Sequence, residues 1–161
     1  GGQNTPDNPT KPSPMQKSPK RGVSFDFKKI DDLPILSPSV SWSYNWGNSQ
    51  NTTAALWFDT NEMDFCPMCW NNSYSADKIR EYVKEHPNTK YLLGFNEPNL
   101  TDQCNMTPSQ AAEHWPQVVA LAKELNLLLI SPAMNYGTLA GYHDPIKWLD
   151  EFFALRIGNM L

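Results

Sequence analysis

Residues 92–99 read Leu92-Leu93-Gly94-Phe95-Asn96-Glu97-Pro98-Asn99, a short apolar run that ends abruptly on an amide, a carboxylate and a proline. The apolar part is typical of a strand buried on both faces of a parallel sheet. Pro98 has no N–H to donate to a neighbouring strand, so the strand should end where Asn96 and Glu97 stand. A carboxyl group can donate a proton to a glycosidic oxygen and an amide can hold a sugar hydroxyl, so this strand end is a candidate sugar-cleaving site.

Five runs of strand character follow one another along the chain, with helical or loop material between them. They cover residues 22–27, 40–46, 64–70, 91–96 and 127–132. Ser75 is a suitable cap for a helix over 76–85. The sequence Thr107-Pro108-Ser109-Gln110 has the form of a capping box and predicts a helix to about residue 125, which Pro116 should kink or restart. Asp144-Pro145 begins a further helix.

This alternation of strands and helices predicts parallel βα units, arranged as an open doubly wound sheet or as a (β/α)8 barrel. No glycine-rich phosphate loop follows the first strand, which counts against a dinucleotide-binding sheet. Polar and aromatic residues gather where strands should end, as barrel enzymes arrange their sites. A whole barrel takes about 250 residues, so a 161-residue chain has room for roughly five units. We therefore expect an α/β fold of the (β/α)8 TIM-barrel type over residues 21–161, truncated after about five βα units.

The first twenty residues differ from the rest of the chain. They are rich in proline and almost without apolar side chains, so residues 1–20 are predicted to form a disordered tether. The net charge of −4 and the pI near 5.3 favour neither nucleic acid nor an anionic membrane as a partner. No apolar run approaches the roughly 20 residues of a membrane span. The chain starts at Gly1 without methionine, which suggests a removed leader and an extracellular or cell-surface tethered location.

The three cysteines are Cys66, Cys69 and Cys104. The first two have the spacing of a redox motif or half of a zinc site. They fall in a predicted strand rather than at a helix start, where a reactive thiol would be expected. The histidines show no zinc-like spacing, so buried strand thiols are the favoured interpretation and no metal is predicted. A cysteine-based redox or metal module remains the weakest alternative.

The motifs at the predicted strands share a family likeness. They are Lys20-Arg21-Gly22-Val23-Ser24-Phe25, Ser41-Trp42-Ser43-Tyr44-Asn45-Trp46-Gly47, Phe65-Cys66-Pro67-Met68-Cys69-Trp70, Leu93-Gly94-Phe95-Asn96-Glu97-Pro98 and Asn105-Met106-Thr107-Pro108, with Ala111-Ala112 and Trp115-Pro116 after them. Together they resemble the catalytic core of glycoside hydrolase family 128, a family of β-1,3-glucanases on a (β/α)8 barrel. The cysteines at 66 and 69, and Cys104, depart from the family's usual pattern.

The resemblance implies a retaining mechanism that uses two glutamates and no cofactor. Glu97 matches the acid/base, and Asn96 matches the amide that binds the sugar beside the cleaved bond. The family's nucleophile lies at the end of strand seven and has no counterpart in these 161 residues. The chain alone is therefore expected to be an inactive part of an endo-β-1,3-glucanase-like enzyme whose full-length parent is monomeric and acts on a β-glucan polysaccharide.

Aromatic and amide side chains at the other strand ends are candidates for sugar binding. Trp70 ends the third predicted strand and is the best aromatic platform for a pyranose ring. Tyr44 and Trp46 share a face of the second strand and serve either as platforms or as packing. Asn135 and Tyr136 follow the fifth strand and are candidates to line the groove. A protein that keeps these platforms but only binds β-glucan, without cleaving it, is the alternative function.

Overall fold

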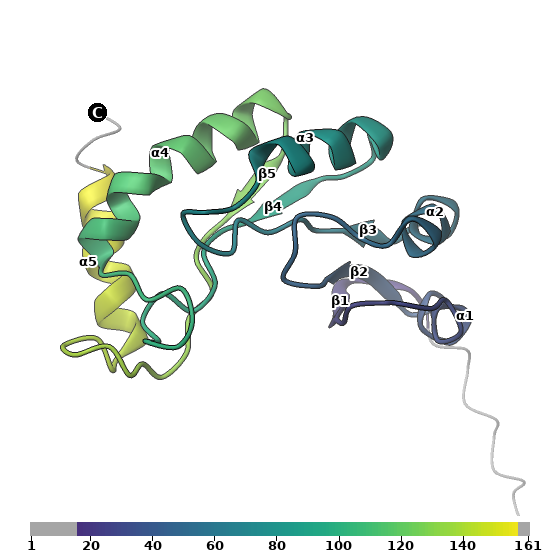
Figure 1. Cartoon of the computed structure of the whole chain (residues 1–161). Helices are drawn as coiled ribbons and strands as arrows, with labels where there is room; N and C mark the ends of the chain where they lie inside the picture. Colours follow the sequence, from purple (N-terminus) through teal and green to yellow (C-terminus); the bar gives the residue numbers. More distant parts are fainter. Residues whose placement is uncertain (1–15, 158–161) are drawn as a thin grey trace, which may run out of the picture.

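The computed structural model describes residues 16–157, which form five strands and five helices in alternation (Figure 1). In chain order they are β1 (Ser18–Ser24), α1 (Leu33–Leu36), β2 (Val40–Tyr44), α2 (Thr52–Thr60), β3 (Asp64–Phe65), α3 (Ala76–Glu85), β4 (Tyr91–Leu93), α4 (Pro108–Glu124), β5 (Leu128–Ile130) and α5 (Pro145–Ile157). Each strand is followed by a helix, as the βα pattern predicts.

All strand pairs are parallel and follow the order of the chain. One sheet has the order β1-β2-β3 and a second consists of β4 and β5. An isolated parallel bridge between Met68 and Leu93 connects the two sheets, and the Leu93 N–H donates to the Pro67 carbonyl at 2.9 Å. A further bridge between Asn96 and Ala133 extends the pairing of β4 and β5 beyond the strands themselves. The ends of the third, fourth and fifth strands therefore lie side by side.

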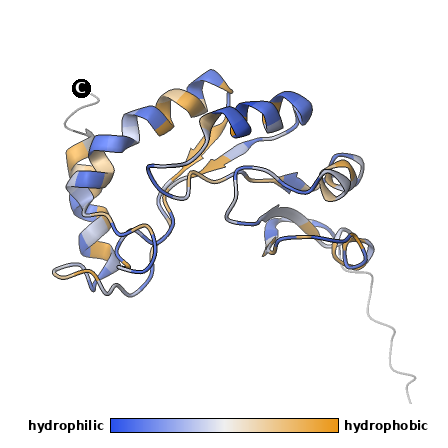
Figure 2. Cartoon of the chain, viewed as in Figure 1, coloured by the Kyte–Doolittle hydropathy of each residue, from blue (hydrophilic) through white to orange (hydrophobic). Residues whose placement is uncertain are grey.

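Two apolar clusters fix the helices against this row of strands. The larger one contains Leu92 and Phe95 of the fourth strand region and packs against α4 and α5 through Trp115, Trp148 and Phe152. Figure 2 shows hydrophobic residues concentrated where α4 and α5 meet each other and along β4 and β5. The smaller cluster, with members such as Phe27, Phe58 and Phe65, lies under α1 and α2. Burying these side chains is the main favourable contribution to folding.

Local capping signals located two helices correctly. The Ser75 side chain accepts from the Lys78 N–H at the start of α3. Thr107 and Gln110 form the reciprocal capping box of α4, which continues through Pro116 to Glu124 without restarting. The short α1 and the nine-residue α2 were not predicted as helices. The unrecognised signal for α2 was Asn51, whose side chain accepts from Thr53 and Ala54 N–H groups ahead of an apolar run.

The strands are shorter than the apolar runs suggested, and the first begins earlier. Residues 66–70, 94–96 and 131–132 were predicted as strand but lie outside β3, β4 and β5; among them, Met68 and Asn96 take part in isolated bridges. β1 begins at Ser18, so the predicted tether cannot reach residue 20; its residues 1–15 lie outside the described part of the chain. Ser18 belongs to β1 because it pairs with Val40 of β2.

The sheet is open within residues 16–157, so the fold is established as a parallel α/β fold but not as a closed barrel. Its helix-free face leaves apolar side chains uncovered: Leu128 of β5 is 64% exposed and Ile130 is 40% exposed. Leu129, between them, points the other way and packs against the helix-covered cluster. This alternation is that of a strand with one covered and one uncovered face.

Candidate active site

Glu97 lies just beyond β4 in a strained backbone conformation. Its φ is +44°, in the left-handed region that non-glycine residues rarely adopt, and it directly precedes a proline. Such strain costs about 1–3 kcal/mol and persists only where the surroundings enforce it. Here the Glu97 N–H donates to the Ala133 carbonyl at 2.8 Å, and the Leu100 N–H donates to the Glu97 carbonyl at 3.0 Å. The Glu97 side chain is half-buried rather than enclosed in the apolar core.

The loop after β5 supplies the polar neighbour of this carboxylate. Asn135 Nδ2 donates to Glu97 Oε1 at 3.1 Å, across 38 positions of sequence. The Tyr136 N–H donates to Asn135 Oδ1 at 2.8 Å, which fixes which end of the Asn135 amide faces the glutamate. The carboxylate and the amide therefore meet at the ends of two neighbouring parallel strands, which is where α/β enzymes place their sites.

Asn96 and Trp70 lie at the same edge. The Asn96 N–H donates to the Trp70 carbonyl at 2.9 Å, so the ends of the third and fourth strand regions are hydrogen-bonded to each other. Asn96 is only 5% exposed, and its Nδ2 donates to Gln103 Oε1 at 3.1 Å. Gln103 was missed by sequence reasoning because no local pattern distinguishes it; it reaches Asn96 only because the chain folds back between them. Trp70 is half-buried.

The predicted aromatic platforms divide into two places. Tyr44 and Trp46 contact each other edge to face at 5.2 Å, and Tyr44 stacks on Trp42 at 6.5 Å. Trp46 is 42% exposed and has a φ of +61°, so the turn after β2 presents its ring to solvent. Tyr136 is 86% exposed beside Asn135. Within the described chain, neither Tyr44 nor Trp46 has a hydrogen bond or ring contact with Glu97 or Asn135.

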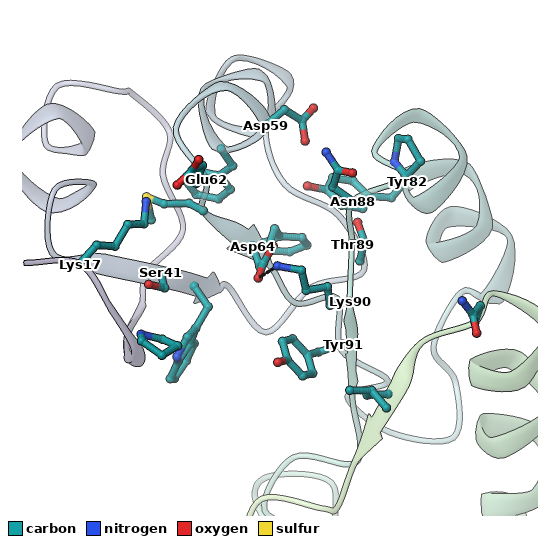
Figure 3. A pocket seen from close by; sticks show the side chains of 18 residues that line it. Lys17, Ser41, Asp59, Glu62, Asp64, Tyr82, Asn88, Thr89, Lys90 and Tyr91 are labelled. Atoms are coloured by element: carbon teal, nitrogen blue, oxygen red, sulfur yellow. Dashed lines mark hydrogen bonds and ion pairs between the residues drawn. The ribbon is translucent and has the colours of Figure 1, made fainter.

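A cavity of about 990 Å³ lies at the opposite end of the strands from Glu97. Figure 3 shows Asp64, Lys90 and Tyr91, which begin their strands or directly precede them, facing this space together with Glu62 of the turn after α2. Lys90 Nζ pairs with Asp64 Oδ2 at 2.9 Å. The cavity is therefore at the edge where strands begin, and none of the predicted site residues lines it.

The thiols are buried and unpaired, as the sequence predicted. Burial raises the pKa of Cys66 to about 12, with the nearby Asp64 adding to the effect. Burial alone raises the pKa of Cys69 and of Cys104 to about 12. A thiol that stays protonated at neutral pH is a poor nucleophile, because the thiolate is the reactive form. In the described range, no three His, Cys, Asp or Glu side chains lie close enough together to hold a metal ion.

Comparison with known proteins agrees with this geometry. Residues 22–156 match the family described as the glycosyl hydrolase catalytic core. The chain belongs to this family. Its resemblance to glycoside hydrolase family 128, drawn from the strand motifs, is confirmed by solved structures. No curated protein sequence matches the chain.

Solved endo-β-1,3-glucanases are similar to this glycosyl hydrolase core. A family 128 subgroup II enzyme from Pseudomonas viridiflava is 41% identical with a TM-score of 0.81, over 89% of this chain and 56% of its own. A second, from Sorangium cellulosum, is 36% identical with a TM-score of 0.76, over 86% and 56%. A mutant subgroup I enzyme from Amycolatopsis mediterranei in complex with laminaripentaose is 26% identical, with a TM-score of 0.62, over 87% and 52%. The chain thus spans little more than half the length of these structures.

None of the helices in the described range is both long and apolar enough to cross a membrane.

Proposed function

We propose that this chain supplies the acid/base half of an active site that hydrolyses β-1,3-glucan with retention of configuration, and that Glu97 is the proton donor. One observation carries the proposal: the strained backbone at Glu97 holds a half-exposed carboxylate at the end of a parallel strand, next to an amide from the neighbouring strand end. The similar enzymes act on β-1,3-glucan, and one of them was crystallised with substitutions at either of two glutamates.

In this mechanism Glu97 donates its proton to the glycosidic oxygen as the bond to the leaving sugar breaks, and later takes a proton from the attacking water. Asn135 holds Oε1 in place throughout. Asn96, fixed by Gln103, lies beside the carboxylate and is proposed to bind the sugar next to the cleaved bond. Trp70, Trp46, Tyr44 and Tyr136 are proposed as stacking surfaces for further sugar rings.

Retention needs a second carboxylate about 5–5.5 Å from the first. Within residues 16–157, the hydrogen-bonding partner of the Glu97 carboxylate is an amide and not a second acid. We propose that the nucleophile comes from a part of the full-length protein outside these 161 residues and that this chain is inactive by itself. The parallel strand order and the exposed Leu128 and Ile130 support a truncated (β/α)8 barrel, whose missing strands would cover that face.

The decisive experiment uses the full-length native protein and two substrates. With laminarin, Glu97→Ala should lower kcat/KM by about 10²–10⁴-fold, the usual contribution of a general acid. With 2,4-dinitrophenyl β-laminaribioside, whose leaving group needs no proton, the loss in kcat/KM should be much smaller because the first step no longer requires the acid. Retention is checked by NMR of the first anomer released, which should be the β form.

Glu62→Ala is the matched control. Glu62 is also a glutamate with positive φ, at +52°, but it lines the cavity at the other end of the strands. Its substitution should leave the turnover of both substrates unchanged. Equal losses of kcat/KM for Glu97→Ala on both substrates would contradict the role as a proton donor. Laminarin binding without any release of reducing ends would instead establish a non-catalytic glucan-binding protein.

We further propose a monomeric parent and an extracellular or cell-surface tethered location, the latter because the proposed substrate is a polysaccharide. Cell fractionation and sedimentation of the full-length protein test the two statements. Recovery of the protein in the cytoplasmic fraction, or as a stable dimer, would contradict them.

A further inference from the structure

Asn99 is a fully buried polar residue, and burying an amide costs free energy unless it is hydrogen-bonded. Its side chain is 0% exposed, and it lies two positions after the proposed proton donor. Asn99 Nδ2 donates to two carbonyl oxygens of the loop after β5, those of Asn135 at 2.7 Å and Tyr142 at 3.2 Å. Both protons of this buried amide are used by one distant loop, whereas its Oδ1 accepts no hydrogen bond in the described structure.

The main chain of Asn99 binds the same loop a second time. Its carbonyl oxygen accepts from the Thr138 and Leu139 N–H groups, each at 3.0 Å. Both ends and the middle of the segment 135–142 are therefore attached to a single residue. Gly137 shows how closely the segment lies against it, because a Cβ at this position would be 2.3 Å from the Tyr142 carbonyl oxygen and 2.6 Å from Asn99 Nδ2.

The contact to Asn135 has a consequence for the site. The backbone carbonyl of Asn135 is held by Asn99, and its side-chain oxygen is held by the Tyr136 N–H. With these two oxygens held, the Asn135 NH₂ group faces Glu97 Oε1, to which it donates at 3.1 Å. We propose that Asn99 is a positioning residue that acts through Asn135: by holding the loop after β5, it aims the Asn135 amide at the Glu97 carboxylate.

This inference rests on the proposed function of Glu97, yet it concerns geometry that can be measured without turnover. The readout is the Asn135 side-chain NH₂ signal in ¹⁵N–¹H correlation spectra, assigned by its loss in Asn135→Ala. In the otherwise native chain, Glu97→Gln should shift this signal, because the acceptor of its hydrogen bond changes from a carboxylate to an amide. In the Asn99→Ala background, the signal should move to the position of a free asparagine and should no longer respond to Glu97→Gln.

Thr138→Ala is the matched control. Thr138 Oγ1 accepts from the Thr101 N–H at 2.9 Å and lies 3.0 Å from the Thr101 hydroxyl, so its removal also cuts a connection between the same two loops. It leaves the Asn99–Asn135 contact intact and should keep the native response to Glu97→Gln. Loss of the response in Thr138→Ala as well would overturn the specific role of Asn99 and indicate general loosening of the loop.

A native Asn135 signal that still responds to Glu97→Gln in Asn99→Ala would also overturn the inference. Should Asn99→Ala fail to fold, Gly137→Ala makes the same test, because the added methyl pushes the loop away from Asn99 Nδ2 while leaving Asn99 in place. The response should again be lost, and its persistence would refute the proposal. The proposed function fails by a different result, equal losses of kcat/KM for Glu97→Ala on the two substrates, so the two outcomes are separable.

Discussion

Raising the pH from 8 to 10 should strongly destabilise this protein, through its three buried thiols. In the folded chain, burial raises the pKa of Cys66, Cys69 and Cys104 to about 12, whereas a thiol of the unfolded chain titrates near 9.0. Between these two values the unfolded state has lost protons that the folded state still holds. Stability is therefore fully present below about pH 9 and falls as the pH rises toward 12.

The magnitude follows from the same two values. At pH 10 an unfolded thiol is roughly 90% ionised and a folded one is almost wholly protonated, which favours unfolding by about 1.4 kcal/mol per thiol. Three thiols together give about 4 kcal/mol, a large part of the ~5–15 kcal/mol that holds a typical domain folded. Burial also raises the pKa of Tyr82. Because an unfolded tyrosine titrates near 10.0, its contribution grows mainly above the range measured.

The assay is urea unfolding followed by circular dichroism at pH 8, 9 and 10, with a non-thiol reductant present to prevent oxidation. The free energy of unfolding should fall by about 4 kcal/mol over this range. The control is the triple variant Cys66→Ala, Cys69→Ala, Cys104→Ala, whose stability should depend far less on pH than that of the wild type. A wild-type stability that does not change between pH 8 and 10, or an equally steep dependence in the triple variant, would refute the reasoning.

Three further predictions concern the packing that positions the site, and each is measured by urea unfolding. Thr107→Ala removes the cap of α4 and should cost about 1 kcal/mol, while an unchanged midpoint would show that the capping box is dispensable. Gly94→Ala should cost about 1–3 kcal/mol, because its Cβ would lie 2.8 Å from the Ile130 carbonyl oxygen; a neutral result would mean that β5 moves freely. Trp148→Phe leaves the buried Met106 carbonyl without the indole donor now at 2.8 Å and should cost about 1–3 kcal/mol, whereas Trp148→Phe without effect would imply another donor for that carbonyl.

Features that depend on neighbours in the sequence were predictable. The bounds of α3 and the start of α4 follow from Ser75 and Thr107, because a cap acts on N–H groups only two or three residues away. The end of the fourth strand was predicted at Asn96 from Pro98, whereas β4 ends at Leu93. The strand lengths were less predictable, because an apolar run indicates burial and not whether a partner strand continues beside it.

The residues around the carboxylate could be named from sequence only as separate candidates. Nothing local indicates that Asn135 reaches Glu97 or that Gln103 holds Asn96. The two residues of each pair are 38 and 7 positions apart, and folding alone brings them together. The buried role of Asn99 was hidden for the same reason, since its partners at 135 and 142 belong to another loop. The sequence by itself determined the family and the βα order and pointed to Glu97 as the proposed acid, since these rest on residue type and short spacing. Only the tertiary structure decided which amide faces that acid, because hydrogen bonds between distant loops depend on how the strands are placed side by side.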